Sequence, residues 1–150
     1  MKKIVCIIVC ALFTTYGIAQ NKQTQKASFQ LSYNNLKSLV QSKAYKFTGN
    51  FVYNNKNREK LENNTNTIVV NRNEASCNIT SLSFENKKIE TNGPMQNYNV
   101  KFDDEKQAIA INFKIGNNEI YLDIKPNGNT FLTAKSSVIN IMQVGELIKL

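Results

Sequence analysis

The chain of 150 residues contains no histidine and no tryptophan, and it has only three cysteines. Histidine is the side chain whose charge ordinarily changes near neutral pH, and it is the usual base of a Ser-His-Asp triad. Its absence excludes that triad and every metal site built on imidazole. The hydrophobic fraction of 41% and the charged fraction of 20% are those of an ordinary globular protein, so a disordered chain or a coiled coil is a poor fit.

Residues 1–19 have the three-part pattern of a secretory signal peptide. Met1 to Lys3 is a short positive segment, Ile4 to Phe13 is an apolar run, and the small side chains of Gly17 and Ala19 mark a cleavage site. The apolar run is shorter than the roughly twenty residues that cross a membrane. We therefore expect export, cleavage between Ala19 and Gln20, and no membrane span in the mature chain.

Cleavage at this point changes the cysteine chemistry. Cys6 and Cys10 would leave with the signal peptide, so the mature chain would keep Cys77 alone. One thiol forms no intramolecular disulfide and cannot complete a four-sulfur metal site. Residues 75–79 read as a strand with odd positions inward, which favours a buried and inert Cys77; the alternative is a thiol that links two copies into a dimer.

The charge is basic and scattered along the chain. The net charge of +8 becomes about +6 once Lys2 and Lys3 leave with the signal peptide. No run of lysines resembles a nucleic-acid-binding arm, and the aromatic-basic motif of an RNA-binding sheet is absent. A basic protein outside the cytoplasm meets anionic lipid headgroups and polysaccharides, so we expect a small molecule or envelope ligand as the partner, and no nucleic acid.

The mature chain is expected to begin with one helix. Residues 20–28 are polar and indicate a flexible lead-in to a single β-rich domain over 29–150. From Phe29 to Ala44 the apolar side chains recur every three or four positions, which is typical of an amphipathic helix, and Ser28 suits its N-terminal cap. Such a helix needs a sheet against which its apolar side can pack.

The next part of the chain predicts strands and one long loop. From Tyr45 to Tyr53 aromatic side chains stand at alternate positions, which places an aromatic stripe on one side of a strand. The polar residues from Asn54 to Asn66 indicate an exposed loop. The triplet Asn92-Gly93-Pro94 indicates an interruption. Further strands are expected over residues 67–70 and 75–84.

The last third of the chain alternates most clearly between apolar and polar residues. The alternating runs cover residues 98–102, 109–115 and 120–124, and further strands are expected over 131–135 and 138–147. Short turns rich in glycine and asparagine separate several of them, as in hairpins. We predict a mainly β fold: a curved antiparallel meander with the N-terminal helix on its apolar face, or a sheet that curls into a barrel and covers itself.

One acidic cluster, Asp103-Asp104-Glu105, deserves a test as a metal site. A calcium loop places its oxygen ligands at alternating positions and closes with a glutamate, and this cluster lacks that spacing. The cluster therefore indicates a hairpin turn.

A pair of carboxylates, Glu119 and Asp123, lies on one side of a predicted strand. Two carboxyl groups at close range could catalyse hydrolysis of a sugar bond. Lys114 and Lys125 accompany them, however, and this pattern favours a solvated ladder of charges. We therefore assign no catalytic, cofactor-binding or metal-binding residue, and expect no cofactor and no enzyme activity.

The segment from Val40 to Phe51 runs from a helix end into a Tyr-x-Phe strand at Tyr45-Lys46-Phe47. Near the C-terminus a turn at Asn127-Gly128 is followed by Ser136-Ser137 and Gly145. These features resemble DUF4251, a family of small exported domains of unknown function found mainly in the Bacteroidetes, over about residues 36–148. The resemblance implies export and a mainly β domain, and it implies no activity.

Three functions from different classes remain. The first is a non-catalytic secreted or periplasmic protein that binds an apolar or anionic ligand at the cell envelope. The second is a small hydrolase that uses Glu119 and Asp123. The third is an interaction or inhibitor module that acts through the loop over 54–66. The aromatic stripe, the basic charge and the lack of catalytic side chains favour the first.

Overall fold

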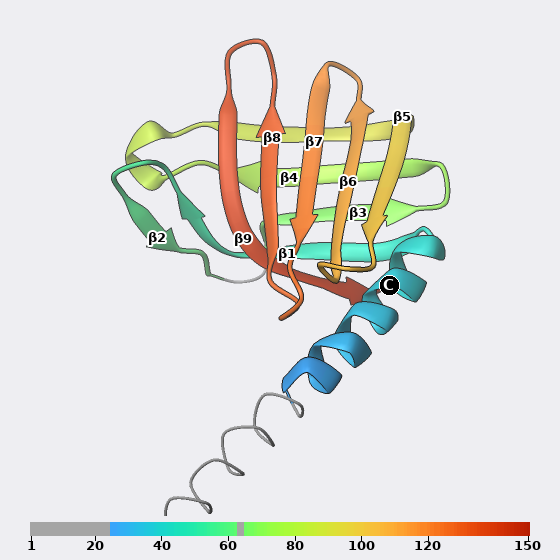
Figure 1. Cartoon of the computed structure of the whole chain (residues 1–150). Coiled ribbons are helices and arrows are strands. Elements are labelled where there is room, and N and C mark those ends of the chain that lie inside the picture. The colour runs from blue at the N-terminus through green and yellow to red at the C-terminus, as the bar shows by residue number, and fades with distance from the viewer. Residues whose placement is uncertain (1–24, 63–64) are drawn as a thin grey trace, which may run out of the picture.

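A computed structural model describes residues 25–62 and 65–150 of the chain (Figure 1). The predicted signal peptide at 1–19 lies outside the described residues. A helix over residues 25–41 leads into one antiparallel sheet. The elements after the helix are β1 (Ala44–Tyr53), β2 (Arg58–Lys60), β3 (Thr67–Asn71), β4 (Glu74–Thr80), the short 3-10 helix η1 (Ser83–Glu85), β5 (Lys88–Asp103), β6 (Ala108–Ile115), β7 (Asn118–Ile124), β8 (Thr130–Lys135) and β9 (Asn140–Lys149).

The first and last strands of the sheet pair with each other and close it into a barrel. Neighbouring strands follow the order β1-β3-β4-β5-β6-β7-β8-β9, and β9 pairs antiparallel with β1. The short strand β2 pairs with the far end of β1, beyond the part that β3 occupies. The predicted mainly β fold, with an antiparallel meander that curls until it covers itself, is confirmed.

The barrel is flattened into two layers whose strands cross steeply (Figure 1). Strands β6 to β9 form one layer, and β1, β3 and β4 form the other. The long strand β5 belongs to both, because its first half pairs with β4 and its second half pairs with β6. The β5–β6 register shifts between Gln96 and Asn99, and such a bulge bends a strand where it passes from one layer to the next.

The predicted interruption at Asn92-Gly93-Pro94 was wrong, since β5 runs through it without a break. Pro94 lies opposite Glu74, at the very end of the β4–β5 ladder. The N–H that proline lacks is therefore not needed inside the ladder, which is why the strand tolerates it.

A bulge in β1 also overturns the predicted aromatic stripe. Tyr45 and Phe47 face the interior and have no exposed surface. The register with β9 then shifts by one residue just before Phe51, so that Val52 becomes the buried residue while Phe51 and Tyr53 lie on the outer side. One extra residue reverses the alternation of a strand, and the aromatic side chains of β1 are consequently divided between the two faces.

The predicted loop over residues 54–66 is partly wrong, because it contains β2. Residues 54–57 form a tight turn in which Asn54 Oδ1 accepts hydrogen bonds from the backbone N–H groups of Lys56 (2.9 Å) and Asn57 (2.8 Å). Asn54 favours a turn through its own side chain, and the turn allows β2 to fold back onto β1.

The strand predicted over 75–84 is shorter than expected, since β4 ends at Thr80 and η1 follows.

The helix packs across one end of the barrel. It already includes residues 25–28, so the flexible lead-in predicted there was wrong at its C-terminal end, and Ser28 is not its cap. Tyr33 and Val40 are buried, and the Tyr33 hydroxyl donates a hydrogen bond to Asp104 Oδ1 at 2.6 Å. Across residues 25–62 and 65–150, no helix is both long enough and apolar enough to span a membrane.

The barrel interior is filled with side chains. Isoleucine and leucine side chains of β6, β7 and β8 alternate inward with exposed fractions of 2% or less, and they form one cluster with the inward residues of β1, β3 and β4. Closely packed interiors of this kind leave little room for a ligand. The surface and the ends of the barrel are therefore where a site must be sought.

Candidate functional site

Two grooves share the turn that joins β1 to β2. The first, which we call the end groove, has a volume of about 350 Å³ and lies between this turn, η1 and the start of β9. The second, which we call the outer groove, has a volume of about 490 Å³ and lies between the same turn and the outward side chains of β8 and β9. Both are large enough for a small molecule or for part of a larger one.

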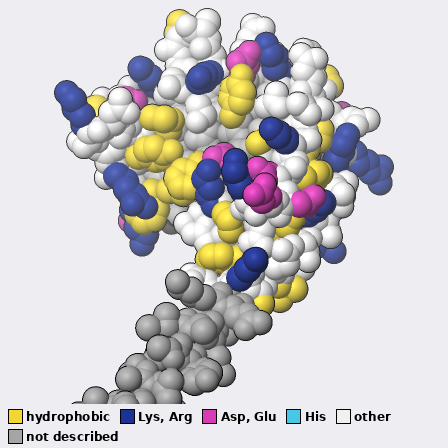
Figure 2. Space-filling view, viewed as in Figure 1, with side chains coloured by type: hydrophobic (Ala, Val, Ile, Leu, Met, Phe, Trp, Pro, Cys, Tyr) yellow, Lys and Arg dark blue, Asp and Glu magenta, His cyan; other side chains and the backbone are white. Residues whose placement is uncertain are grey.

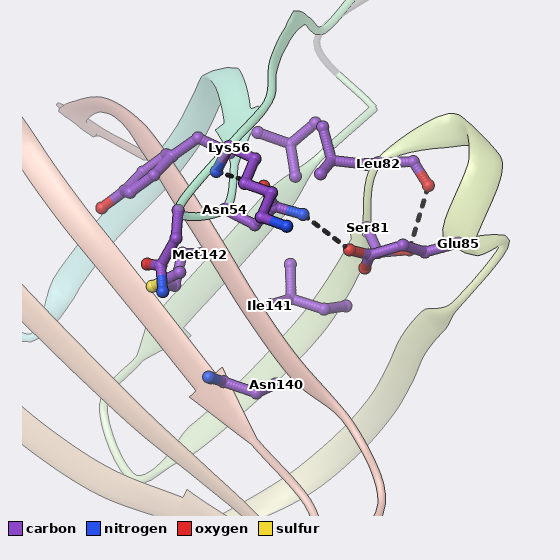
Figure 3. A pocket seen from close by; sticks show the side chains of 11 residues that line it. Asn54, Lys56, Ser81, Leu82, Glu85, Asn140, Ile141 and Met142 are labelled. Carbon is purple, nitrogen blue, oxygen red and sulfur yellow. Dashed lines mark hydrogen bonds between the residues drawn. The ribbon is translucent and has the colours of Figure 1, made fainter.

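The end groove is lined by both apolar and polar side chains, and two of the polar ones are bonded to each other (Figure 3). Leu82 and Ile141 are each 1% exposed and supply its apolar part. The Asn54 amide donates a hydrogen bond to Glu85 Oε1 at 3.1 Å, and the side chain of Lys56 lies beside them. One cation and one carboxylate in the same lining balance each other, so this groove does not select a ligand by charge.

The outer groove is different, because its charged side chains have one sign. Lys56 and Arg58 both line it, and no Asp or Glu is among the described lining residues. Phe131 and Val144, which face each other across the β8–β9 ladder, supply its apolar surface. Tyr53 and the amides of four asparagines complete the lining: Asn54, Asn55, Asn57 and Asn129. This combination suits a ligand that has both a negative charge and an apolar surface.

Basic side chains stack on outward aromatic rings beyond the groove as well. The Arg58 guanidinium lies 4.0 Å from the centre of the Phe51 ring, and Phe51 is opposite Val144 on β9. Further along the same face, Lys125 lies 5.9 Å from the Phe131 ring centre and Lys135 lies 5.8 Å from that of Tyr121. We call these six side chains the basic-aromatic strip: Phe51, Arg58, Phe131, Lys125, Tyr121 and Lys135.

The strip crosses adjacent strands on the outside of the barrel. The ladder pairs Phe51–Val144 and Val144–Phe131 connect β1, β9 and β8. On the next strand, β7, the residue opposite Phe131 is Asp123, and Tyr121 lies two positions away on the same face. Hydrophobic, basic and acidic side chains lie side by side over the face that β7, β8 and β9 turn toward the viewer in Figure 2. A cation held over a ring face is attracted to it, so each ring also helps to fix the position of its cation.

Glu119 and Asp123, the carboxylates considered for hydrolysis, lie on the outer side of β7 and line neither groove. Four residues along a strand place their Cα atoms about 13 Å apart, whereas paired catalytic carboxyl groups lie roughly 5–9.5 Å apart. Lys114 Nζ is 2.7 Å from Glu119 Oε1, and Lys125 forms an ion pair with Asp123. The predicted ladder of solvated charges is confirmed.

The electrostatics of Glu119 also disfavour a role as a proton donor. Hydrogen bonds from Lys114 and from the Tyr121 hydroxyl lower the pKa of Glu119 below its usual value. A general acid needs a raised pKa so that it carries a proton near neutral pH. Glu119 is therefore ionised under the conditions in which such an acid would have to donate.

The acidic cluster forms the β5–β6 turn, as predicted, and it anchors the helix. Asp104 accepts hydrogen bonds from Tyr33 at 2.6 Å and from Lys37 at 2.7 Å. The Lys37 bond, followed by the Tyr33 bond, lowers the pKa of Asp104. Among the described residues no group of three Asp, Glu, Cys or His side chains is arranged to hold a metal ion.

Cys77 is buried in β4 with 2% of its surface exposed, so the predicted burial is confirmed. Burial raises the pKa of its thiol to about 12. The sulfur is therefore protonated at neutral pH and shielded from oxidants, and a link between two copies through Cys77 would require the barrel to open.

The sequence reasoning missed Arg58 and Phe131. Arg58 lies within the predicted loop, where nothing in the local pattern indicates a partner ring. Phe131 and Tyr121 carried a usable signal, because each is a large aromatic residue at an outward position of an alternating strand. Exposed aromatic side chains that gather on one face often mark a binding surface.

The fold and its grooves can be set beside known proteins. The family model described as "Domain of unknown function (DUF4251)" matches residues 21–145. The chain belongs to this family. The resemblance found in the sequence is thereby confirmed, while the family description assigns no activity to its members.

A DUF4251 family protein from Bacteroides eggerthii DSM 20697 has a similar crystal structure, with a TM-score of 0.69 at 16% sequence identity. The alignment covers 83% of this chain and 91% of that chain. At this identity the similarity establishes the fold. The curated proteins contain no match to the sequence.

Proposed function

We propose that this member of the DUF4251 family is an exported, non-catalytic binding protein, and that its outer groove takes a ligand with an anionic group and an apolar surface. The observation that carries the proposal is the lining of the groove, in which Lys56 and Arg58 accompany Phe131 and Val144 with no carboxylate among the described lining residues. Cations near an apolar floor attract such a ligand through charge and retain it through burial.

The position of Arg58 supports the proposal. Its guanidinium is stacked on Phe51, so the planar fork of N–H donors is partly fixed before any ligand arrives. A side chain that is already ordered loses less conformational entropy on binding, which raises the affinity of the site. Arg58 is therefore the residue that we expect to hold the anionic group.

Export is part of the proposal, and residues 1–19 support it. Their pattern is that of a signal peptide, and the family match begins at residue 21, just beyond the expected cleavage site. N-terminal sequencing of the protein recovered from the envelope of its host should begin at Gln20. Recovery of the intact N-terminus would contradict cleavage.

The dye anilinonaphthalene sulfonate, an aromatic anion, is a suitable probe of the outer groove. We expect saturable binding to the folded protein, followed by dye fluorescence, and a loss of about threefold or more in affinity for Arg58→Gln and for Phe131→Ala. Affinity should also fall as salt is added, because the contact is electrostatic.

Two matched controls separate the groove from the general surface. Arg72→Gln removes the same charge from the β3–β4 turn, and Phe84→Ala removes an exposed ring from η1; neither residue lines the outer groove. Both should leave the affinity unchanged. Equal losses for Arg58→Gln and Arg72→Gln would show that the dye responds only to net charge and would overturn the proposed site.

A further inference from the structure

The outer groove is only the beginning of a longer charged surface. The basic-aromatic strip continues from it across β9 and β8 to β7, and strands in a sheet are about 4.8 Å apart, so the strip is about 14 Å long. A small anion would fill the groove and leave Tyr121 and Lys135 without contact. The length of the strip points to an extended ligand.

The charges along the strip are not fully compensated within the chain. Lys125 is paired with Asp123. Lys135 lies opposite Glu119 on the β7–β8 ladder, but Glu119 forms its ion pair with Lys114, so these three side chains keep one net positive charge. Among the described residues Arg58 takes part in no ion pair. Arg58 and Lys135 lie near opposite ends of the strip, on β2 and β8, and each is close to an outward ring. A partner with anionic groups at intervals would complement both of them.

The polar and aromatic groups favour a carbohydrate over a lipid surface. Of the four asparagine amides that line the groove, that of Asn54 is already bonded to Glu85 and to its own turn, whereas Asn55, Asn57 and Asn129 are exposed. Exposed amides can both donate hydrogen bonds to hydroxyl groups and accept them. Phe131 and Tyr121 are only 36% and 41% exposed, so they lie within the face and do not protrude as membrane-inserting side chains do. Flat rings of this kind suit the apolar face of a sugar ring.

We propose that the basic-aromatic strip binds a segment of an acidic polysaccharide, with Arg58 and Lys135 holding carboxylates at its two ends. This inference rests on the proposed function of the outer groove and extends it to a ligand class and to residues outside the groove. Substitutions of Lys135 and Tyr121 distinguish polysaccharide binding along the strip from ligand binding in the groove, because neither residue lines the groove.

Polygalacturonate and its short oligomers test the inference by titration calorimetry. Affinity should increase from the monomer to the tetramer as the strip becomes covered, and Lys135→Gln should lower oligomer affinity by about threefold while dye binding in the groove is unchanged. Lys101→Gln, which removes the same charge from the outer side of β5, should lower neither.

Neutral dextran, vesicles containing phosphatidylglycerol and a DNA duplex complete the comparison. Preferential binding of polygalacturonate over all three supports the inference. Tighter binding of vesicles or of DNA overturns it, as does an affinity that does not change with oligomer length. If the dye binds through Arg58 and polygalacturonate does not bind, the inference fails and the proposed function stands; if neither binds, both fail.

Discussion

The inside of the barrel and its outer face are built under different constraints. Where β1 pairs with β9, the two backbones lie in close contact: a Cβ on Gly145 would lie 1.8 Å from the carbonyl oxygen of Thr48. At Gly116, in the β6–β7 turn, an added Cβ would meet nothing within 4 Å. The contact between β1 and β9 therefore admits only glycine at position 145, whereas the β6–β7 turn leaves open space around Gly116.

The polar groups differ between the two regions as well. Inside, Gln143 is fully buried, and its amide donates hydrogen bonds to Asn66 Oδ1 at 2.8 Å and to the Thr80 carbonyl at 2.9 Å. Asn66 Oδ1 also accepts from the Thr80 N–H and hydroxyl. Outside, Asn54 bonds to Glu85 and to its own turn, while Asn55, Asn57 and Asn129 of the outer groove are exposed. Buried amides stabilise the closure, whereas exposed amides remain available to a ligand.

The largest effect is expected for Gly145→Ala. The new methyl group would overlap a backbone oxygen, which cannot rotate away, so β1 and β9 must separate. We expect a loss of about 4 kcal/mol or more in the free energy of unfolding, or failure to fold, measured by urea denaturation.

Gly116→Asn is the matched control for that substitution. Gly116 has a φ of +57°, a conformation that asparagine tolerates, and the space around it is open. We expect a loss of less than about 1 kcal/mol. A Gly145→Ala protein that is as stable as this control would contradict the close contact between the backbones of β1 and β9.

A smaller effect is expected where the obstacle is a side chain. A Cβ on Gly49 would lie 2.3 Å from Gln143 Oε1, and this flexible amide can move only by giving up its hydrogen bonds to Asn66 and Thr80. Gly49→Ala should destabilise the protein by about 2 kcal/mol, and by about 1 kcal/mol less in a Gln143→Ala background. Strict additivity in this double-mutant cycle would show that the two residues do not meet.

The free energy of unfolding at alkaline pH should depend on the burial of Cys77. The pKa of its thiol is about 12 in the folded protein and about 8.5 in an unfolded chain, so stability is full below about pH 8.5 and falls as the pH rises toward 12. Between these two pKa values, the free energy of unfolding should fall by about 1.4 kcal/mol less per pH unit in Cys77→Ala than in the wild type.

Urea denaturation at pH 8, 9 and 10 measures this difference. Burial raises the pKa of Tyr33 to about 12, so Tyr33 also lowers the stability at alkaline pH. It does so equally in both proteins and does not affect their comparison. Identical slopes for the wild type and for Cys77→Ala would mean that the thiol is accessible in the folded state.

The smallest effect is expected on the outer face. The double substitution Glu119→Gln with Asp123→Asn removes two exposed ion pairs, which contribute little because water and salt screen them. The denaturation midpoint should not change measurably, and polygalacturonate should bind more tightly because two negative charges next to the strip are gone. A large loss of stability would show that the outer charges support the fold.

The parts of the fold that could be predicted are those in which alternation is unbroken. Strands β6 and β7 follow the apolar pattern residue by residue, and the turns between β5 and β8 contain the expected glycines, asparagines and acids. The errors fall at the bulge of β1, in the segment over 54–66 that contains β2, at the end of β4, and at Asn92-Gly93-Pro94 within β5. The bulge of β1 shows why. A single inserted residue leaves the local composition unchanged and reverses which side chains face the interior, so a pattern in one strand cannot reveal it.

The candidate site was less accessible to sequence reasoning for a related reason. Phe131 could be recognised as an outward ring, but its neighbours Val144 and Phe51 lie on strands far away in the chain. The bulge in β1 is what turns Phe51 outward and lets Arg58 stack on it. The aromatic residues of β1 were identified from the sequence, and the face on which half of them lie was not.

The pairing of β1 with β9 also has a consequence for how the chain matures. Tyr45 lies opposite Lys149, so β1 cannot complete its pairing until a segment about a hundred residues later in the chain has folded against it. Until that strand is available, one edge of β1 exposes unpaired backbone groups and invites pairing with other molecules. A fold closed by its last strand is therefore vulnerable to C-terminal truncation, and a protein that has lost β9 should aggregate, with β1 as the strand that seeds it.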